Sequence, residues 1–349
     1  MYVRRSPDIM LDWGGPGLSV YDTKRFVRMR VPAPLVAALA EIGAWTPRSD
    51  VPALVDDATM ARLRQFHLVE CADTPQTARP ASTWERWGNA AAYFHAVGAA
   101  ARYVTGGEER EELVAEIAAD EPPAFFKEDV DYRGVVALPE PVALPGLLTE
   151  ALTARRTCRA FTDSAVPLAA LATLLHYGFR PTAYLDAGVF GQVPLRASPC
   201  AGGRNEIEAY VFALHVDGLE SGLYHYSPRR HALGLLDPAT GRDELLAAAF
   251  DQPALRTAPV VVATAAVLER VSYKYRHARA YRLLGYDAGH TGQTFALTAT
   301  ALGLFPYQSA AYDDAALAGL LRLDFPEEIP TYLLAAGHAR NPDAPGLPG

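Results

Sequence analysis

The sequence contains few cysteines and no long hydrophobic run, and each absence excludes a class of protein. Its three cysteines, Cys71, Cys158 and Cys200, are widely spaced and odd in number. This pattern favours free thiols in a reducing compartment and predicts neither a disulfide framework nor a metal site. No stretch approaches the ~20 apolar residues of a membrane-spanning helix. Residues 1–16 also lack the apolar core of a signal peptide. We therefore expect a soluble cytoplasmic protein.

An excess of positive charge is also missing. The formal net charge is −8 at pH 7, which argues against a nucleic-acid partner because such proteins are usually basic. Half of the residues are hydrophobic and 21% are charged, as in an ordinary globular protein. A chain of 349 residues is long enough for two domains and a large core.

The first 120 residues predict a small, mainly helical module. Apolar residues three or four apart predict a helix from Pro34 to Ile42. The order of the expected elements resembles a winged-helix module. These elements are extended pieces at 18–21 and 26–29, helices or helical turns at 34–42, 51–54 and 57–66, and a β-like stretch at 67–70.

Three interpretations of this module are open. A winged helix that reads DNA needs basic residues on its third helix, and here Arg62 and Arg64 lie close to Asp56 and Asp57. A surface that docks a peptide is therefore at least as well supported as a DNA reader. A helical cap that only packs against the second domain is the third interpretation.

Two further helices complete this module, and an extended connection follows it. An alanine-rich helix from Trp84 to Val104 carries an aromatic stripe, which is typical of a core or a dimer contact. An acidic helix runs from Glu108 to Asp120, and recurrent prolines then exclude a helix. We therefore divide the chain into a module at 1–120, an extended connection at 121–143 that wraps the second domain, and a second domain at 144–349. The stripe comprises Trp84, Trp87, Tyr93, Phe94 and Val97, and the prolines are Pro122, Pro123, Pro139, Pro141 and Pro145.

The second domain predicts an α+β fold in which helices flank a sheet. A continuous apolar run from Pro259 to Val267 is typical of a central strand that is buried on both faces. Small residues within a long helix, Arg279 to Leu302, allow close helix packing. The other expected elements are a helix at 168–177, a polar loop up to Leu195, a strand at 208–216, hairpin arms at 222–226 and 231–236, and a strand at 331–336.

Two stretches of this domain have the composition of a ligand site. The stretch Arg155–Phe161 holds three guanidinium groups and one hydroxyl, which together match the oxygens of a phosphate. If it is extended, Arg155, Thr157 and Arg159 share one face. The alternative is a solvated basic patch with a buried Phe161.

The second stretch, Ser198–Glu206, has small residues and two adjacent glycines. Such a loop lets the backbone approach a flat or anionic ligand closely, and the alternative is a tight loop with no ligand. Neither the G-x-G-x-x-G nor the G-x-x-x-x-G-K-[ST] spacing is present, so the sequence does not predict a Rossmann or P-loop site.

Five motifs, in the same order over residues 144–340, resemble one known family. The first resembles the Arg-Arg-Ser-x-Arg-x-Phe opening of FMN-dependent nitroreductase-fold proteins. The others resemble the SagB-type branch, the azoline dehydrogenases of thiazole/oxazole-modified peptide biosynthesis. The motifs are Arg155–Phe161, Pro199–Gly203, Gly222–Tyr226, the Lys-Tyr pair in Tyr273–Tyr275, and Asp287–Gln293 followed by Ala301–Leu304.

This resemblance implies a nitroreductase-like fold with a mixed, mainly antiparallel sheet. It also implies a homodimer that binds FMN at the subunit interface. Arg155 and Thr157 would hold the phosphate, Arg159 would face the pyrimidine edge of the flavin, and the loop 200–203 would come from the partner chain. The implied cofactor-binding residues are Arg155, Arg156, Thr157, Arg159, Pro199, Cys200, Ala201, Gly202, Gly203, Gln293, Gln308, Ser309, Ala310, Gly337 and Arg340.

The implied reaction oxidises a thiazoline or oxazoline ring to a thiazole or oxazole. A base removes the α-carbon proton, a hydride passes to the flavin N5, and O₂ reoxidises the flavin. Lys274 is the candidate base if burial lowers its pKa, and the Tyr275 hydroxyl would relay the proton or stabilise the transition state. The alternative is that Lys274 is solvated and Tyr275 only packs.

The resemblance has departures, and other functions are open. Cys200 and Thr157 stand where serine is usual, and Asn205-Glu206 replaces an aromatic- or His-Pro pair. The expected substrate is a modified peptide or a carrier-bound azoline, and the N-terminal module would dock a leader, carrier or cyclodehydratase. The alternatives are an NAD(P)H-driven reductase of nitroaromatics or quinones and a flavin-free peptide-binding scaffold. The acidity of the chain disfavours a transcription regulator.

Overall fold

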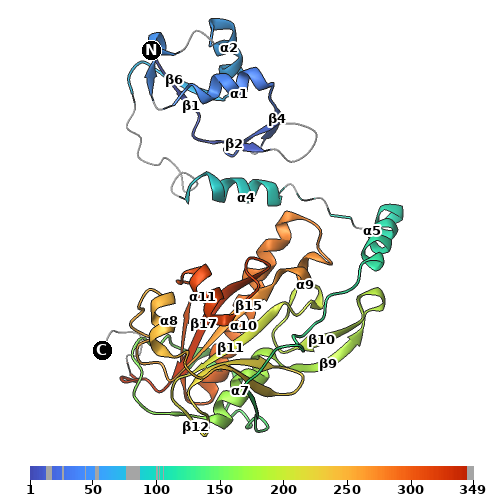
Figure 1. The fold of residues 1–349 in the computed structure, drawn as a ribbon, viewed down its shortest axis with the longest axis vertical. Coiled ribbons are helices and arrows are strands. Elements are labelled where there is room, and N and C mark those ends of the chain that lie inside the picture. Colours follow the sequence, from blue (N-terminus) through green and yellow to red (C-terminus); the bar gives the residue numbers. More distant parts are fainter. Residues whose placement is uncertain are drawn as a thin grey trace. The chain divides into compact units, whose positions relative to one another are not determined.

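The chain forms two compact units, Met1–Arg102 and Tyr103–Gly349 (Figure 1). The computed structural model describes residues 1–12, 18–25, 27–43, 45–51, 55–75, 87–99, 101, 103–104 and 106–343. No helix in these ranges is both long enough and apolar enough to span a bilayer. Parts of the expected stretches at 26–29 and 51–54, and Trp84, lie outside the described residues.

The N-terminal unit combines short helices with two three-stranded sheets, in the orders β5-β1-β6 and β2-β3-β4. The Asp56 side chain accepts a hydrogen bond from the Thr59 backbone N–H at 2.7 Å and so caps one helix. Its elements are β1 (Tyr2–Arg5), β2 (Ile9–Asp12), β3 (Ser19–Asp22), β4 (Val27–Arg30), α1 (Ala33–Ala40), β5 (Thr46–Pro47), η1 (Arg48–Asp50), α2 (Asp57–Gln65), β6 (Val69–Ala72) and α4 (Asn89–Ala99).

Several of these elements match the sequence predictions and others do not. Helices α1 and α2 and strand β6 lie where helix or strand was expected, whereas the pairing of β1 with both β5 and β6 was not foreseen. The expected aromatic stripe is not the buried face of α4. That face consists of Ala92 and Ala96, whereas Trp87 and Phe94 are exposed. Tyr93 of the stripe lies edge-on to Tyr21, with 5.3 Å between the ring centroids.

A seven-stranded sheet, in the order β16-β17-β15-β11-β13-β14-β7, forms the centre of the C-terminal unit. Every neighbouring pair in it is antiparallel. The expected buried strand at 259–267 is the third of the seven, between β17 and β11, as its apolar run predicts. The strands are β7 (Gly134–Ala137), β11 (Ile207–Ala213), β13 (Gly222–Ser227), β14 (Ala232–Asp237), β15 (Val260–Val267), β16 (Phe305–Ser309) and β17 (Glu328–Gly337).

Helices cover both faces of this sheet, and alternate strand residues point to opposite faces (Figure 1). On β15, Val260 and Val262 join one apolar cluster with residues of α7 and α10, whereas Val261 and Ala263 join a second cluster with residues of α8 and α11. The C-terminal unit is therefore an antiparallel sheet with helices on both faces, the α+β arrangement that the sequence predicted. The helices are α5 (Gly107–Ala119), α6 (Leu148–Ala154), α7 (Leu168–Phe179), α8 (Arg242–Ala248), α9 (Leu268–Ser272), α10 (Tyr281–Ala301) and α11 (Asp314–Leu321).

Two segments differ from the sequence predictions. The expected polar loop up to Leu195 is a hairpin of β9 (Pro181–Asp186) and β10 (Gln192–Arg196), which turns through η2 (Gly188–Phe190). Its strands were missed because most of their side chains are exposed, so they carry no apolar run. The proline-rich connection is extended, as expected, but its β7 also pairs with β14 as the edge strand of the main sheet.

Candidate functional site

The arginine-rich stretch runs in an extended path along one edge of the sheet. After α6 ends, the Cys158 N–H donates to the Pro306 carbonyl of β16 at 2.8 Å. The Arg340 N–H donates to the Ala160 carbonyl at 2.9 Å, so the chain beyond β17 lies beside the stretch. Cys158 and Phe161 are buried, whereas Thr157 and Arg159 are more exposed. Thr157 and Arg159 therefore flank a buried Cys158, as an extended stretch requires, but the exposed Arg156 shows that the expected alternation does not extend back to Arg155. Arg155, Thr157, Arg159 and Arg340 all come from segments along this edge.

Two other predicted residues of this edge have roles within the fold. Arg156 turns back along the chain, where its Nη1 donates to the carbonyls of Thr153 and Arg155 at 2.9 and 2.8 Å. Gly337 allows close packing, because a Cβ atom there would stand 2.7 Å from a side-chain carbon of Pro259 and 2.9 Å from one of Phe161. Arg156 and Gly337 therefore lie at this edge, but their contacts indicate structural roles. Arg156 caps backbone carbonyls at the end of α6, and Gly337 permits close packing.

The glycine loop, η3 (Ala201–Gly203) with Ser198–Cys200 before it, is fixed along α10. The Ala201 N–H donates to the Asp287 carboxylate at 2.7 Å. Near the start of the loop, the Ser198 hydroxyl donates to that of Thr294 at 2.7 Å. Gly202 and Gly203 have φ values of 59° and 69°, a region that glycine adopts at no steric cost.

Lys274 and Tyr275 lie directly against this loop. The Lys274 ammonium donates to the Gly202 carbonyl at 3.3 Å. A Cβ atom on Gly202 would stand 2.6 Å from the Tyr275 hydroxyl and 3.0 Å from Lys274 Nζ. The predicted catalytic pair and the predicted cofactor loop, which are separated by 72 residues, therefore meet. Phe190, from the turn of the β9–β10 hairpin, places its ring 4.5 Å from Lys274 Nζ.

The surroundings of Lys274 and Tyr275 shift the pKa of both side chains. Burial, with a smaller effect from the Arg204 guanidinium, lowers the pKa of Lys274. Burial, with a smaller effect from Asp287, raises the pKa of Tyr275. Arg204 is itself fully buried, with its guanidinium carbon 4.6 Å from the Phe125 ring centre. A lysine with a lowered pKa is neutral more often and can act as a base.

Sequence reasoning missed the acidic groups behind the loop. Glu206 is completely buried, and burial together with the Asp287 carboxylate raises its pKa. Two carboxylates that interact in a low-dielectric interior do not both ionise readily. The one mark of Glu206 in the sequence is that it stands where the resembled motif has a proline. Asp287 was named only as part of a motif and had no assigned role.

The remaining predicted residues lie on β16, on α10 or just before the glycine loop. The Gln308 side chain of β16 donates to the Gly292 carbonyl of α10, and Gln293 follows on an exposed position. Ser309 accepts a hydrogen bond from the Ala311 N–H at 3.1 Å. Ala310 and Pro199 are exposed.

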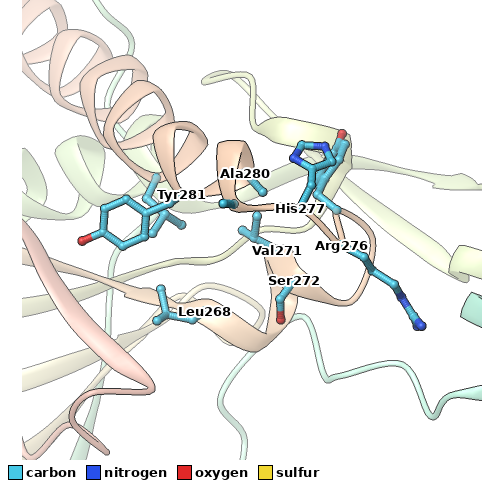
Figure 2. A pocket seen from close by; sticks show the side chains of 10 residues that line it. Leu268, Val271, Ser272, Arg276, His277, Ala280 and Tyr281 are labelled. Carbon is cyan, nitrogen blue, oxygen red and sulfur yellow. The ribbon is translucent and has the colours of Figure 1, made fainter. Parts of the chain in front are cut away.

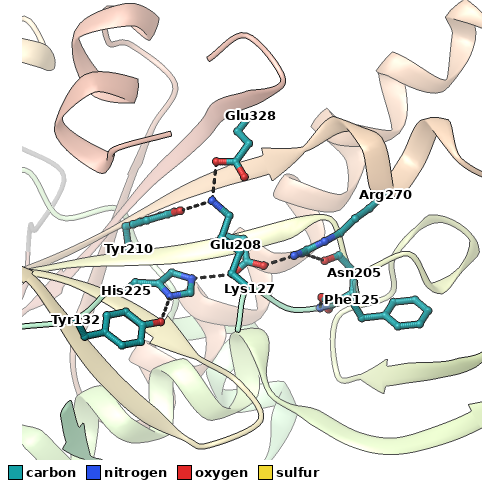
Figure 3. A network of polar contacts seen from close by, with 9 residues as sticks. All are labelled: Phe125, Lys127, Tyr132, Asn205, Glu208, Tyr210, His225, Arg270 and Glu328. Atoms are coloured by element: carbon teal, nitrogen blue, oxygen red, sulfur yellow. Dashed lines mark hydrogen bonds and ion pairs between the residues drawn. The ribbon is translucent and has the colours of Figure 1, made fainter. Parts of the chain in front are cut away.

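A buried ionic network supports the Lys274 side of the site (Figure 3). Arg270 of α9 donates from Nη1 to the Asn205 carbonyl at 2.9 Å and to the Glu208 carboxylate at 2.6 Å. His225 lies 2.9 Å from the other Glu208 oxygen. Because Arg270 precedes Lys274 by four residues and also holds Asn205, the network fixes both the Lys-Tyr segment and the end of the glycine loop.

The extended connection is tied into the same network (Figure 3). The Tyr132 hydroxyl lies 2.6 Å from His225 Nδ1. Lys127 pairs with Glu328 at 2.6 Å and donates to the Tyr210 hydroxyl at 3.1 Å. At the other end of this segment, the Phe125 carbonyl accepts a hydrogen bond from Asn205 Nδ2 at 2.8 Å, so residues 125–132 contact the network at several points.

Gly202→Ala is expected to destabilise the fold by about 1–3 kcal/mol, because alanine is strained at this positive φ. The added Cβ would also displace Tyr275 and Lys274. Gly285→Ala is the matched control: no atom lies within 4 Å of its added Cβ, and it should stabilise α10 by up to ~1 kcal/mol. Urea unfolding of both variants measures this difference. Equal effects of the two substitutions would contradict the close contact at Gly202.

A sequence model described as "Nitroreductase family" matches residues 152–338, which is more than half of the chain. The matched range begins within α6 and ends just after β17. It therefore includes the arginine-rich edge up to residue 338, the glycine loop and the Lys-Tyr pair.

Three individual proteins are similar to this chain, two of them provisionally described as nitroreductases. MJ1384 of Methanocaldococcus jannaschii is 31% identical over 191 residues, which cover 54% of this chain and 90% of that protein. The trifolitoxin-processing protein TfxB of Rhizobium leguminosarum bv. trifolii is 31% identical over 155 residues, 43% of this chain and 42% of TfxB. An Anabaena variabilis crystal structure shares the fold with TM-score 0.53 and 23% identity, covering 77% of this chain and 49% of that one.

Proposed function

Because the chain belongs to the nitroreductase family, whose members are generally FMN oxidoreductases, we propose that it is an FMN-dependent azoline dehydrogenase. Its substrate would be a thiazoline or oxazoline ring in a modified peptide or a carrier-bound intermediate, and O₂ would be the final oxidant. The similarity to a protein named for trifolitoxin processing supports a processing role. That similarity spans less than half of TfxB.

The residues at the sheet edge fit the phosphate end of FMN. Arg155, Thr157 and Arg340 supply guanidinium and hydroxyl donors on one edge, which is the donor set that a phosphate monoester prefers. Arg159 would add positive charge near the flavin ring, and Gly202 and Gly203 offer backbone that a flat ring can approach. When bound, FMN would supply the acceptor for the electrons and the second hydrogen that leave the azoline.

The contact of Lys274 and Tyr275 with Gly202 is the observation that carries this proposal. Neutral Lys274 takes the proton from the ring α-carbon, and burial favours this neutral form. The Tyr275 hydroxyl stays protonated because its pKa is raised, so it donates a hydrogen bond to the charge that develops on the ring. The Phe190 ring, 4.5 Å from Lys274 Nζ, places an apolar group beside the base.

Mass spectrometry of a synthetic azoline peptide incubated with the purified protein and O₂ tests this function directly. We expect the product to have lost two hydrogens and the protein to be yellow. A protein that is colourless after reconstitution with FMN would instead support a peptide-binding scaffold. A yellow protein that leaves every azoline peptide unchanged would contradict the dehydrogenase.

Arg155→Ala is expected to weaken FMN binding by about 10- to 100-fold, which is the loss of one charge-assisted hydrogen bond. Flavin fluorescence during titration measures the Kd. Arg156→Ala should weaken binding less, because its guanidinium is already held by two backbone carbonyls. If Arg156→Ala released more flavin than Arg155→Ala, the assignment of the phosphate site would be wrong.

An NAD(P)H-dependent nitroreductase is the second candidate. The similarity to MJ1384, which covers 90% of that protein, favours it. Stopped-flow mixing of the holoprotein with NADPH distinguishes the two, because rapid bleaching of the flavin is expected only of the reductase. The Lys-Tyr pair next to the glycine loop favours the dehydrogenase.

The proposal includes a homodimer and a peptide-docking role for the N-terminal unit. In this homodimer the phosphate-binding residues at the sheet edge of one copy and the glycine loop of the other copy would hold one flavin. The N-terminal unit would dock a leader peptide, a carrier or a cyclodehydratase. Light scattering on the holoprotein measures the copy number, and a monomer with tightly bound FMN would contradict the shared site.

A further inference from the structure

A mainly apolar cavity of about 420 Å³ lies beside Tyr275, between α9 and the start of α10 (Figure 2). Figure 2 shows Leu268 and Val271 below Ala280 and Tyr281, while the Arg276 side chain extends away from them. The guanidinium of Arg276 is paired with Asp120. The only other ionisable side chains among the lining residues are those of Tyr275, Tyr281 and His277. The cavity is therefore unsuited to a charged group.

We propose that this cavity binds the apolar or aromatic side chain of the residue next to the azoline ring in a peptide substrate. The inference rests on the proposed function, because it places the ring at Tyr275 and Lys274. The volume falls within the range of about 300–1,000 Å³ that is usual for ligand pockets, which are also mainly apolar with few polar groups. Since Tyr275 belongs to both the cavity wall and the Lys-Tyr pair, a ring at this pair has its neighbouring residue at the cavity.

Aromatic rings on one side of the cavity suit an apolar or aromatic side chain. The His277 ring lines the cavity, with Tyr275 and Tyr103 at centroid distances of 6.4 and 5.3 Å. Its Nδ1 atom is buried within the protein and is therefore not exposed to a ligand in the cavity.

Equilibrium binding of three thiazole peptides to the FMN-loaded protein tests the proposal. Thiazole is already the oxidised ring, so the measurement does not depend on turnover. The peptides carry glycine on both sides of the ring, leucine before it, or leucine after it. We expect one leucine peptide to bind at least about tenfold more tightly than the glycine peptide, because the cavity buries its side chain. Fluorescence anisotropy of labelled peptides measures each Kd.

Two variants assign this preference to the cavity. Ala278→Phe narrows the cavity from an exposed position, and Tyr281→Ala removes part of its wall, so each should reduce the leucine preference to below about threefold. Ala315→Phe, at an exposed position of α11 outside the cavity, is the matched control and should keep it. Circular dichroism confirms the folding of each variant.

The outcomes separate this inference from the proposed function. Azoline oxidation without any leucine preference, or a preference that both cavity variants retain, would overturn the cavity assignment and leave the dehydrogenase intact. A leucine preference that both variants abolish, in a protein that oxidises no azoline, would support the binding site and refute the reaction.

Discussion

Replacing Lys274 with alanine is expected to lower the rate of azoline oxidation by about 10²- to 10⁴-fold, the usual contribution of a positioned base. FMN should remain bound, because its phosphate is expected at the arginine-rich edge. Lys274, which donates to the Gly202 carbonyl, does not belong to that edge. Single-turnover oxidation, followed by mass spectrometry and flavin absorbance, measures both quantities in one sample. Turnover close to that of the wild type would show that another group removes the proton.

Two further measurements distinguish a base from a mere positive charge. Lys274→Arg keeps the charge, but an arginine stays protonated and so should be as inactive as the alanine variant. Because burial lowers the pKa of Lys274, kcat/KM of the wild type should rise with pH and level off below the ordinary lysine value of about 10.4. The residual activity of Lys274→Ala should lack this rise. Arg256→Ala, which removes an exposed cation, is the control and should change neither the rate of azoline oxidation nor its dependence on pH.

The largest expected effect on stability comes from Arg270→Ala. This substitution leaves the buried carboxylate of Glu208 without its guanidinium partner, and breaking such a pair costs about 3–5 kcal/mol. Both side chains are at most 3% exposed, so water cannot replace the lost contact. It also removes the hydrogen bond to the Asn205 carbonyl, so the end of the glycine loop should loosen. Urea unfolding monitored by circular dichroism measures the change.

The exposed pair of Arg256 and Asp251 provides the matched comparison. Arg256→Ala should change the free energy of unfolding by about 1 kcal/mol or less, because water screens an exposed pair. Should Arg270→Ala prove no more destabilising than Arg256→Ala, the network of Figure 3 would not support the fold.

The same network predicts a dependence of stability on pH. Burial alone would raise the pKa of Glu208, but Arg270 and His225 outweigh it and lower the value to about 2. Because the unfolded value is about 4.3, Glu208 stabilises the fold above that pH, and this contribution is lost as pH falls toward 2. In Arg270→Ala this loss should be smaller, since the cation that lowers the pKa is absent.

The sequence predicted those elements whose residue pattern fits only one type of secondary structure. The apolar run of β15 predicted a strand with two buried faces, and the small residues of α10 predicted a helix that can pack closely against another helix. The turn 227–230 predicted the β13–β14 hairpin. By contrast, β9 and β10 form a two-stranded ribbon with mostly exposed side chains, so no buried pattern marks them.

The candidate site was predicted as residues, but its arrangement was not. The motif resemblance named Lys274 and the glycine loop, yet only the fold brings Lys274 to Gly202. The loop 204–208 and α9 meet through Arg270, and nothing in the local sequence around Arg270 marks this role. Glu206 was missed because a buried carboxylate looks like an ordinary surface residue in a sequence.

Strand β7 lies outside the range that the family model matches, although it completes the sheet. The family match begins at residue 152, whereas the sheet begins at residue 134. The matched segment is therefore shorter than the segment that forms the sheet. A substitution in β7 would thus alter the edge of this sheet, although it lies before the matched range.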